Sequence, residues 1–137
     1  MSVISPKVRR SARERAMQFL FGLDFTAYPW EESLELYWEN RPARPSVRDY
    51  AETLVRGVMD RRDELDMIID GALDRWTPER IGRIERNILR VATYEMRHGD
   101  NVPSSVAINE AVEIAKAYGA DESPAFINAV LDRVKDL

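Results

Sequence analysis

The stretch Ser5–Phe25, SPKVRRSARERAMQFLFGLDF, decides the fold class of this 137-residue chain. Ser5 followed by Pro6 is typical of a helix start, because a serine hydroxyl caps the first turn and proline suits the first helical position. Apolar residues then recur every three or four positions, which predicts an amphipathic helix that Pro29 ends. The apolar stripe consists of Val8, Ala12, Ala16, Phe19, Leu20 and Leu23.

The rest of the chain repeats this helical period. Proline, serine or threonine precedes most of the periodic segments, and glycine follows several of them. The expected helical segments are residues 30–40, 46–73, 77–99, 106–119 and 123–134. No segment shows the two-residue alternation of a strand. The sequence therefore predicts an all-α fold, with about six or seven helices in a single bundle-like domain over residues 1–137.

The composition indicates a globular protein of the cytoplasm. Hydrophobic residues make up 45% of the chain and charged residues 32%, which is typical of a folded domain. No apolar run approaches the roughly 20 residues of a membrane helix, and the N-terminus lacks the apolar core of a signal peptide. The chain has no cysteine, which agrees with a cytoplasmic protein and removes thiolate metal sites.

Patterns typical of catalysis or cofactor binding are absent from the sequence. With His98 as the single histidine and no cysteine, a structural zinc site is not expected. Neither a Walker loop nor a G-x-G-x-x-G motif occurs, and without strands there is no nucleotide-binding context for one. The carboxylates fall on helix faces with arginines nearby. We therefore expect no enzyme activity, no cofactor and no metal.

Charge is concentrated at one end of the chain. Five basic residues and one acidic residue give the first fifteen positions a net charge of +4, whereas the remainder carries −8. On a helical wheel Arg9, Arg10 and Arg13 fall within about a 100° arc, and Met17 and Phe21 continue that side. Arginine binds phosphate with two parallel hydrogen bonds and stacks on bases, so this face predicts a surface for single-stranded RNA or phosphate.

Two alternatives to this interpretation remain open at the level of residues. The arginines of a solvated helix end also pair with acidic neighbours without binding any ligand. Phe21 fits either a stacking surface or the hydrophobic core. Further along the chain, Glu95 lies among Ala92, Tyr94 and Met96, so we expect a partly buried carboxylate that is paired within the fold.

Four stretches resemble the NusB family of bacterial transcription antitermination factors. RRSARERAMQFLF, ERNILRVATYEM, VPSSVAINEAVEIAKAYG and FINAVLD occur in the family's order and spacing. The resemblance implies two packed helical subdomains and a heterodimer with NusE, a ribosomal small-subunit protein. That pair would bind the single-stranded boxA element of nascent ribosomal RNA and join an antitermination complex on RNA polymerase. The implied activity is binding, without catalysis or cofactor.

The resemblance also assigns site residues. Those implied in RNA binding are Lys7, Arg9, Arg10, Arg13 and Phe21. Those implied in binding NusE are Phe21, Glu85, Glu122 and Phe126. Glu85 is expected on an exposed turn. Ser11 stands where many relatives extend the arginine run, so a weaker intrinsic RNA affinity is expected. Phe21 stands where relatives often have tyrosine, near the NusE and RNA surface, and lacks that hydroxyl.

Two other functions compete with this interpretation. One is a helical adaptor that binds only protein, or that self-associates through the aromatic residues Trp30, Tyr37 and Trp38. A homodimer that masks the arginine face is also compatible with the antitermination function. The other is the helical domain that precedes the methyltransferase domain of ribosomal RNA cytosine methyltransferases. No α/β domain follows Leu137 in this sequence, which disfavours that function.

Overall fold

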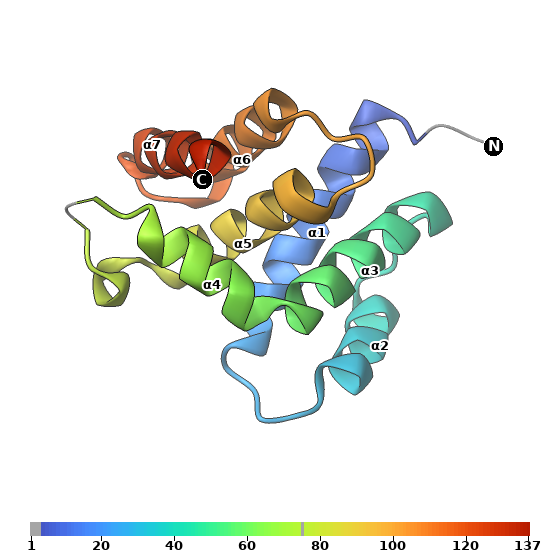
Figure 1. The fold of residues 1–137 in the computed structure, drawn as a ribbon. Helices are drawn as coiled ribbons and strands as arrows, with labels where there is room; N and C mark the ends of the chain where they lie inside the picture. The colour runs from blue at the N-terminus through green and yellow to red at the C-terminus, as the bar shows by residue number, and fades with distance from the viewer. Residues whose placement is uncertain (1–3, 75) are drawn as a thin grey trace.

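A computed structural model describes residues 4–74 and 76–137, and this part of the chain is entirely helical, without strands (Figure 1). The elements are α1 (Pro6–Leu23), α2 (Trp30–Asn40), α3 (Pro45–Asp60), α4 (Arg62–Gly71), a 3₁₀ turn η1 (Pro78–Arg80), α5 (Arg83–His98), α6 (Ser104–Tyr118) and α7 (Ser123–Asp136). The all-α prediction and the expected number of helices are confirmed. None of these helices has the length and apolar character needed to cross a membrane.

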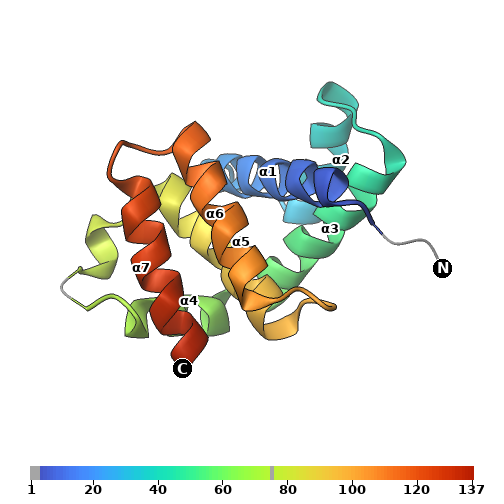
Figure 2. The same ribbon diagram turned by 90° about the horizontal axis from the view of Figure 1, so that it is seen from above.

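The helices form two groups that share α1 and α5. Figures 1 and 2 show α2 and α3 on one side of this central pair and α6 and α7 on the other. The N-terminal core lies between α1, α2, α3 and α5, where Leu20, Trp38 and Val55 are buried. The C-terminal core lies between α4, α5, α6 and α7, where Leu89 and Leu131 are buried. This arrangement agrees with the two packed subdomains that the family resemblance implies.

Helix α1 begins where the sequence predicts. The Ser5 hydroxyl accepts a hydrogen bond from the Val8 backbone N–H at 3.2 Å, with Pro6 in the first helical position. The predicted end is wrong, because the helix stops at Leu23, six residues before Pro29. The backbone N–H groups of Asp24, Phe25 and Thr26 each bond the carbonyl three residues earlier, which closes the last turn.

The predicted long helix over residues 46–73 is wrong, because it is two helices. It breaks at Arg61, whose φ of −125° and ψ of 20° lie outside the helical range. The break redirects the chain, so that α3 packs against α1 and α4 packs against α5. Leu54 and Val58 thereby reach the N-terminal core, whereas Ile69 reaches the C-terminal core.

The predicted start of α5 is also wrong. Thr77 and Pro78 begin only the short turn η1, and α5 starts at Arg83 after Gly82. Helix α5 then lies in the middle of the molecule (Figure 1) and buries residues on several sides, Glu95 among them. Helix α2 has the predicted bounds.

Candidate nucleic-acid and protein interfaces

The exposed start of α1 forms a basic surface, the arginine surface, made of Lys7, Arg9 and Arg10. Lys7 and Arg10 are exposed and Arg9 is half-buried. Arg9 donates a hydrogen bond from Nη1 to the Tyr50 hydroxyl at 3.0 Å, so its guanidinium lies against α3. Arg10 lies against α6, where Nε and Nη2 donate to the two carboxylate oxygens of Glu110 at 3.0 and 2.6 Å. The two arginines therefore diverge to opposite sides of the helix start.

Arg13 does not share this surface, so the expectation of one exposed face with all three arginines is wrong. Its side chain is only 4% exposed. Nε donates to Glu95 at 2.7 Å and Nη1 donates to Glu110 at 3.3 Å. The helical wheel placed Arg13 correctly on the side of Arg9 and Arg10, but one turn further along Glu95 of α5 and Glu110 of α6 lie against that side.

Glu95 is the centre of a buried network, as the sequence predicts for its carboxylate. It is 1% exposed, it accepts from Arg13, and its second oxygen accepts from the Tyr50 hydroxyl. Burial, followed by the charge of Glu95, raises the pKa of Tyr50 far above its usual value, so the hydroxyl keeps its proton and remains the donor. The network joins α1, α3 and α5 directly beneath the arginine surface.

Glu110 was not singled out by the sequence, and it links the network to the surface. Its carboxylate contacts both Arg10 and Arg13 from α6. The hydrogen bond from Arg10 lowers the pKa of Glu110, so the ionised carboxylate stabilises the folded state at neutral pH. That contribution to stability is lost as the pH falls below the ordinary pKa of glutamate and then through the lowered pKa of Glu110. The signal available in the sequence was the position of Glu110 within the mostly apolar run VAINEAVEIA.

Phe21 is partly exposed, which decides a question that its sequence left open. The ring packs on the C-terminal core and meets the ring of Phe25 edge-on, with centroids 5.2 Å apart. It also lines a groove of about 760 Å³ between α1 and α2. An aromatic edge is thus available on α1, three turns beyond Arg10.

A second candidate surface surrounds the start of α7. Glu85 is half-buried in the first turn of α5, so the expectation of an exposed turn is wrong. Its carboxylate accepts from the Ser123 hydroxyl at 2.5 Å, and Ser123 Oγ in turn accepts from the Ala120 N–H at 3.0 Å. Glu85 therefore helps to hold the α6–α7 loop as well as presenting charge.

A shallow cavity of about 180 Å³, the partner cavity, lies beside Glu85. Glu122 and Phe126 line it from the start of α7, and Trp76 and Ile81 line it from the other side. Phe126 is half-buried and meets the Trp76 ring edge-on at 5.1 Å, whereas Glu122 is exposed. The structure thus brings together Glu85, Glu122 and Phe126, which the family resemblance implies in binding NusE, and it adds Trp76 to them. The only signal for it in the sequence was a tryptophan just before Thr77 and Pro78.

The aromatic residues of α2 do not form the exposed face that self-association would need. Trp38 is 4% exposed and belongs to the N-terminal core, and Tyr37 packs edge-on against Phe19. Trp30 packs against the same core and lies under the guanidinium of Arg56. In residues 4–74 and 76–137, no group of three or more histidine, cysteine or acidic side chains could hold a metal ion.

Residues 10–136 match the profile of the NusB family. The chain belongs to the NusB family. Among curated relatives, the transcription antitermination protein NusB of Desulfotalea psychrophila is 45% identical over 136 residues, covering 95% of this chain and 96% of its own. The protein of the same name in Geobacter sulfurreducens is 42% identical over 127 residues, covering 92% of each chain.

Solved structures show the same NusB fold. T. maritima NusB matches with a TM-score of 0.85 and 32% identity, over 98% of this chain and 93% of its own. A chain from the crystal structure of antitermination factors NusB and NusE in complex with dsRNA matches with a TM-score of 0.86, over 96% of this chain and 98% of its own. Its sequence identity is 23%, so this match supports the shared fold alone.

Proposed function

We propose that this NusB-family chain is a transcription antitermination factor that binds boxA single-stranded RNA as a heterodimer with NusE. The basic start of α1, on a chain whose remainder carries a net charge of −8, is the observation that supports this most directly. Polyanionic RNA is attracted only to that end, and the acidic remainder suits a basic ribosomal protein. Relatives named antitermination proteins across nearly the whole chain add to this support.

In this proposal Lys7, Arg9 and Arg10 contact RNA phosphates, and Phe21 offers an edge for a base. Arg13 acts from below, because its guanidinium is engaged with Glu95 and Glu110. It would fix the helix start and the Glu110 carboxylate rather than meet the RNA itself.

The partner cavity is the proposed contact for NusE, together with Phe21. Glu85 and Glu122 supply negative charge beside an aromatic pocket that Phe126 and Trp76 line. A basic and partly apolar segment of a ribosomal protein fits that chemistry. The complex would act in the cytoplasm on RNA polymerase, by binding and without catalysis.

The RNA interaction is tested by fluorescence anisotropy of a labelled boxA RNA, titrated with this chain alone and with NusE. Binding is expected to tighten with NusE and to weaken with salt, because each phosphate that is bound releases counterions. The Arg9→Ala/Arg10→Ala variant is expected to lower the slope of log affinity against log salt by about 0.7 for each phosphate that it no longer neutralises. Equal affinity for a scrambled RNA, or a heterodimer that binds no RNA, would contradict the proposal.

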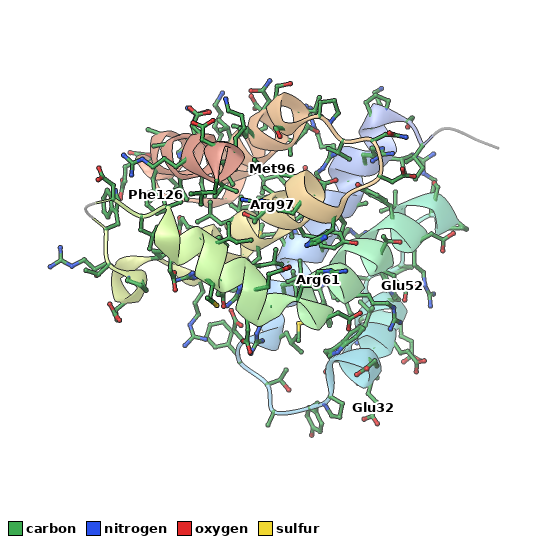
Figure 3. All side chains as sticks on the ribbon, in the orientation of Figure 1. Glu32, Glu52, Arg61, Met96, Arg97 and Phe126 are labelled. Atoms are coloured by element: carbon green, nitrogen blue, oxygen red, sulfur yellow. The ribbon has the colours of Figure 1, made fainter. Side chains whose placement is uncertain are left out.

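The partner interaction is tested by reversing the charge of Glu122. Because Glu122 is exposed, Glu122→Lys leaves the fold intact, and we expect NusE affinity to fall at least about fivefold through like-charge repulsion. Glu32→Lys on α2 makes the same charge change at the far side of the molecule from Phe126 (Figure 3) and should leave affinity within about twofold. Isothermal titration calorimetry measures both variants. An equal decrease of NusE affinity in both variants would mean that net charge, and not a contact at Glu122, causes the effect, which would contradict the proposed partner surface.

A further inference from the structure

Arg10 is held in the geometry that it would offer to a phosphate. Its Nε and Nη2 donate in parallel to the two oxygens of Glu110, at 3.0 and 2.6 Å. This two-bond arrangement is how arginine binds carboxylate and phosphate alike. Glu110 therefore occupies the edge of Arg10 that a phosphate would occupy.

Glu110 can release Arg10 and still remain paired with a second arginine, Arg13. Its side chain is 13% exposed, against 56% for Arg10, so the arginine is the mobile member of the pair. When Arg10 turns away, Arg13 Nη1 remains 3.3 Å from Glu110. Arg13 itself is 4% exposed and anchored to Glu95 at 2.7 Å, so it stays in place. The carboxylate is then not left buried and unpaired, which would be costly.

We propose that Glu110 is an affinity-limiting residue, a carboxylate that RNA phosphate must displace from Arg10 before the arginine surface is fully engaged. This inference rests on the proposed RNA-binding function and names a residue that controls it. This replacement of Glu110 by phosphate at Arg10, the exchange, lowers the affinity of the arginine surface for any phosphate backbone by the same factor. Phosphate contacts alone are thereby kept weak, so that tight binding requires further contacts to bases or to the partner protein.

Two charge-matched variants test this inference. Glu110→Gln removes the carboxylate that Arg10 contacts. Glu113→Gln removes the same charge one turn away on α6, where the Glu113 carboxylate bonds Lys116 at 3.2 Å instead. The probes are boxA RNA and a single-stranded oligouridine of equal length, measured by anisotropy over a range of salt concentrations.

Glu110→Gln is expected to tighten binding of both RNAs by about three- to tenfold, and Glu113→Gln by less than about twofold. The salt slope should steepen by about 0.7 in Glu110→Gln, because Arg10 neutralises one further phosphate. In an Arg10→Ala background the gain from Glu110→Gln should disappear, as expected of two residues that act through each other. Circular dichroism confirms folding; should Glu110→Gln unfold, Glu110→Asp keeps the charge and withdraws the carboxylate from Arg10.

The outcomes separate this inference from the proposed function. If Glu110→Gln tightens oligouridine binding but boxA is never preferred, the exchange at Arg10 stands and the boxA function fails. If wild type prefers boxA but Glu110→Gln binds no better than Glu113→Gln, the exchange is wrong and the function stands. Weaker RNA binding by Glu110→Gln than by wild type also overturns the exchange. Absence of binding to either RNA in all variants overturns both.

Discussion

Replacing Glu95 with alanine is expected to lower the free energy of unfolding by about 3–5 kcal/mol. The side chains of Arg13 and Glu95 are 4% and 1% exposed, so the change removes the closer carboxylate of a buried guanidinium and leaves it only the 3.3 Å contact with Glu110. The Tyr50 hydroxyl loses its acceptor at the same time. Urea denaturation followed by circular dichroism at about 222 nm, where helices absorb, measures the change. A decrease below about 1 kcal/mol would mean that water or a rearrangement compensates Arg13.

A double-mutant cycle and an exposed pair serve as controls for Glu95. Arg13→Met combined with Glu95→Leu should recover most of the stability, because a packed apolar pair avoids the desolvation cost of two charges. Glu52→Ala breaks the i,i+4 pair of Arg48 and Glu52 on α3, whose N–O distance is 3.4 Å. That pair is solvated, so its removal should cost less than about 0.5 kcal/mol.

Replacing Gly57 with alanine is expected to destabilise the fold by about 1–3 kcal/mol, although alanine favours helix. A Cβ at Gly57 would overlap the Tyr94 ring at Cζ and Cε1, so the ring must move. Tyr50 lies two turns before Gly57 on α3, and Glu95 follows Tyr94 on α5. Since the close approach of α3 to α5 is what brings Tyr50 to Glu95, the substitution should also loosen the network. Thermal and urea unfolding measure the change.

The sign of the Gly57 effect depends on its neighbour, which gives a sharp control. In a Tyr94→Ala background the obstruction is gone, and Gly57→Ala should stabilise by about 0.4–1 kcal/mol through the unfolded state. Gly71→Ala should do so in the wild-type background, because nothing lies within 4 Å of a Cβ there. If Gly57→Ala stabilises the wild type as Gly71→Ala does, the contact with Tyr94 does not limit the approach of α3 to α5.

Local sequence signals were sufficient where a helix end depends only on residues close to it in the chain. Ser5 and Pro6 marked the start of α1 because capping depends on residues within one turn. The bounds of α2 followed from prolines on both sides. The same signals failed over 46–73, where packing on a second core redirects the chain, and at Thr77, where only the 3₁₀ turn η1 forms before α5 starts at Arg83. Periodicity finds a stripe of apolar residues, but it does not reveal which core each residue reaches.

The sequence by itself determined the all-helical class, the basic end of the chain and the pairing of Glu95 within the fold. These follow from composition, from a 3.6-residue period and from the cost of burying an unpaired charge, all of which can be read along the chain. Only the tertiary structure decided that Arg13 is buried while Arg10 is exposed, and that Glu110 lies between them. Exposure depends on which side chains lie against α1, and Glu95 and Glu110 come from distant helices, α5 (Arg83–His98) and α6 (Ser104–Tyr118).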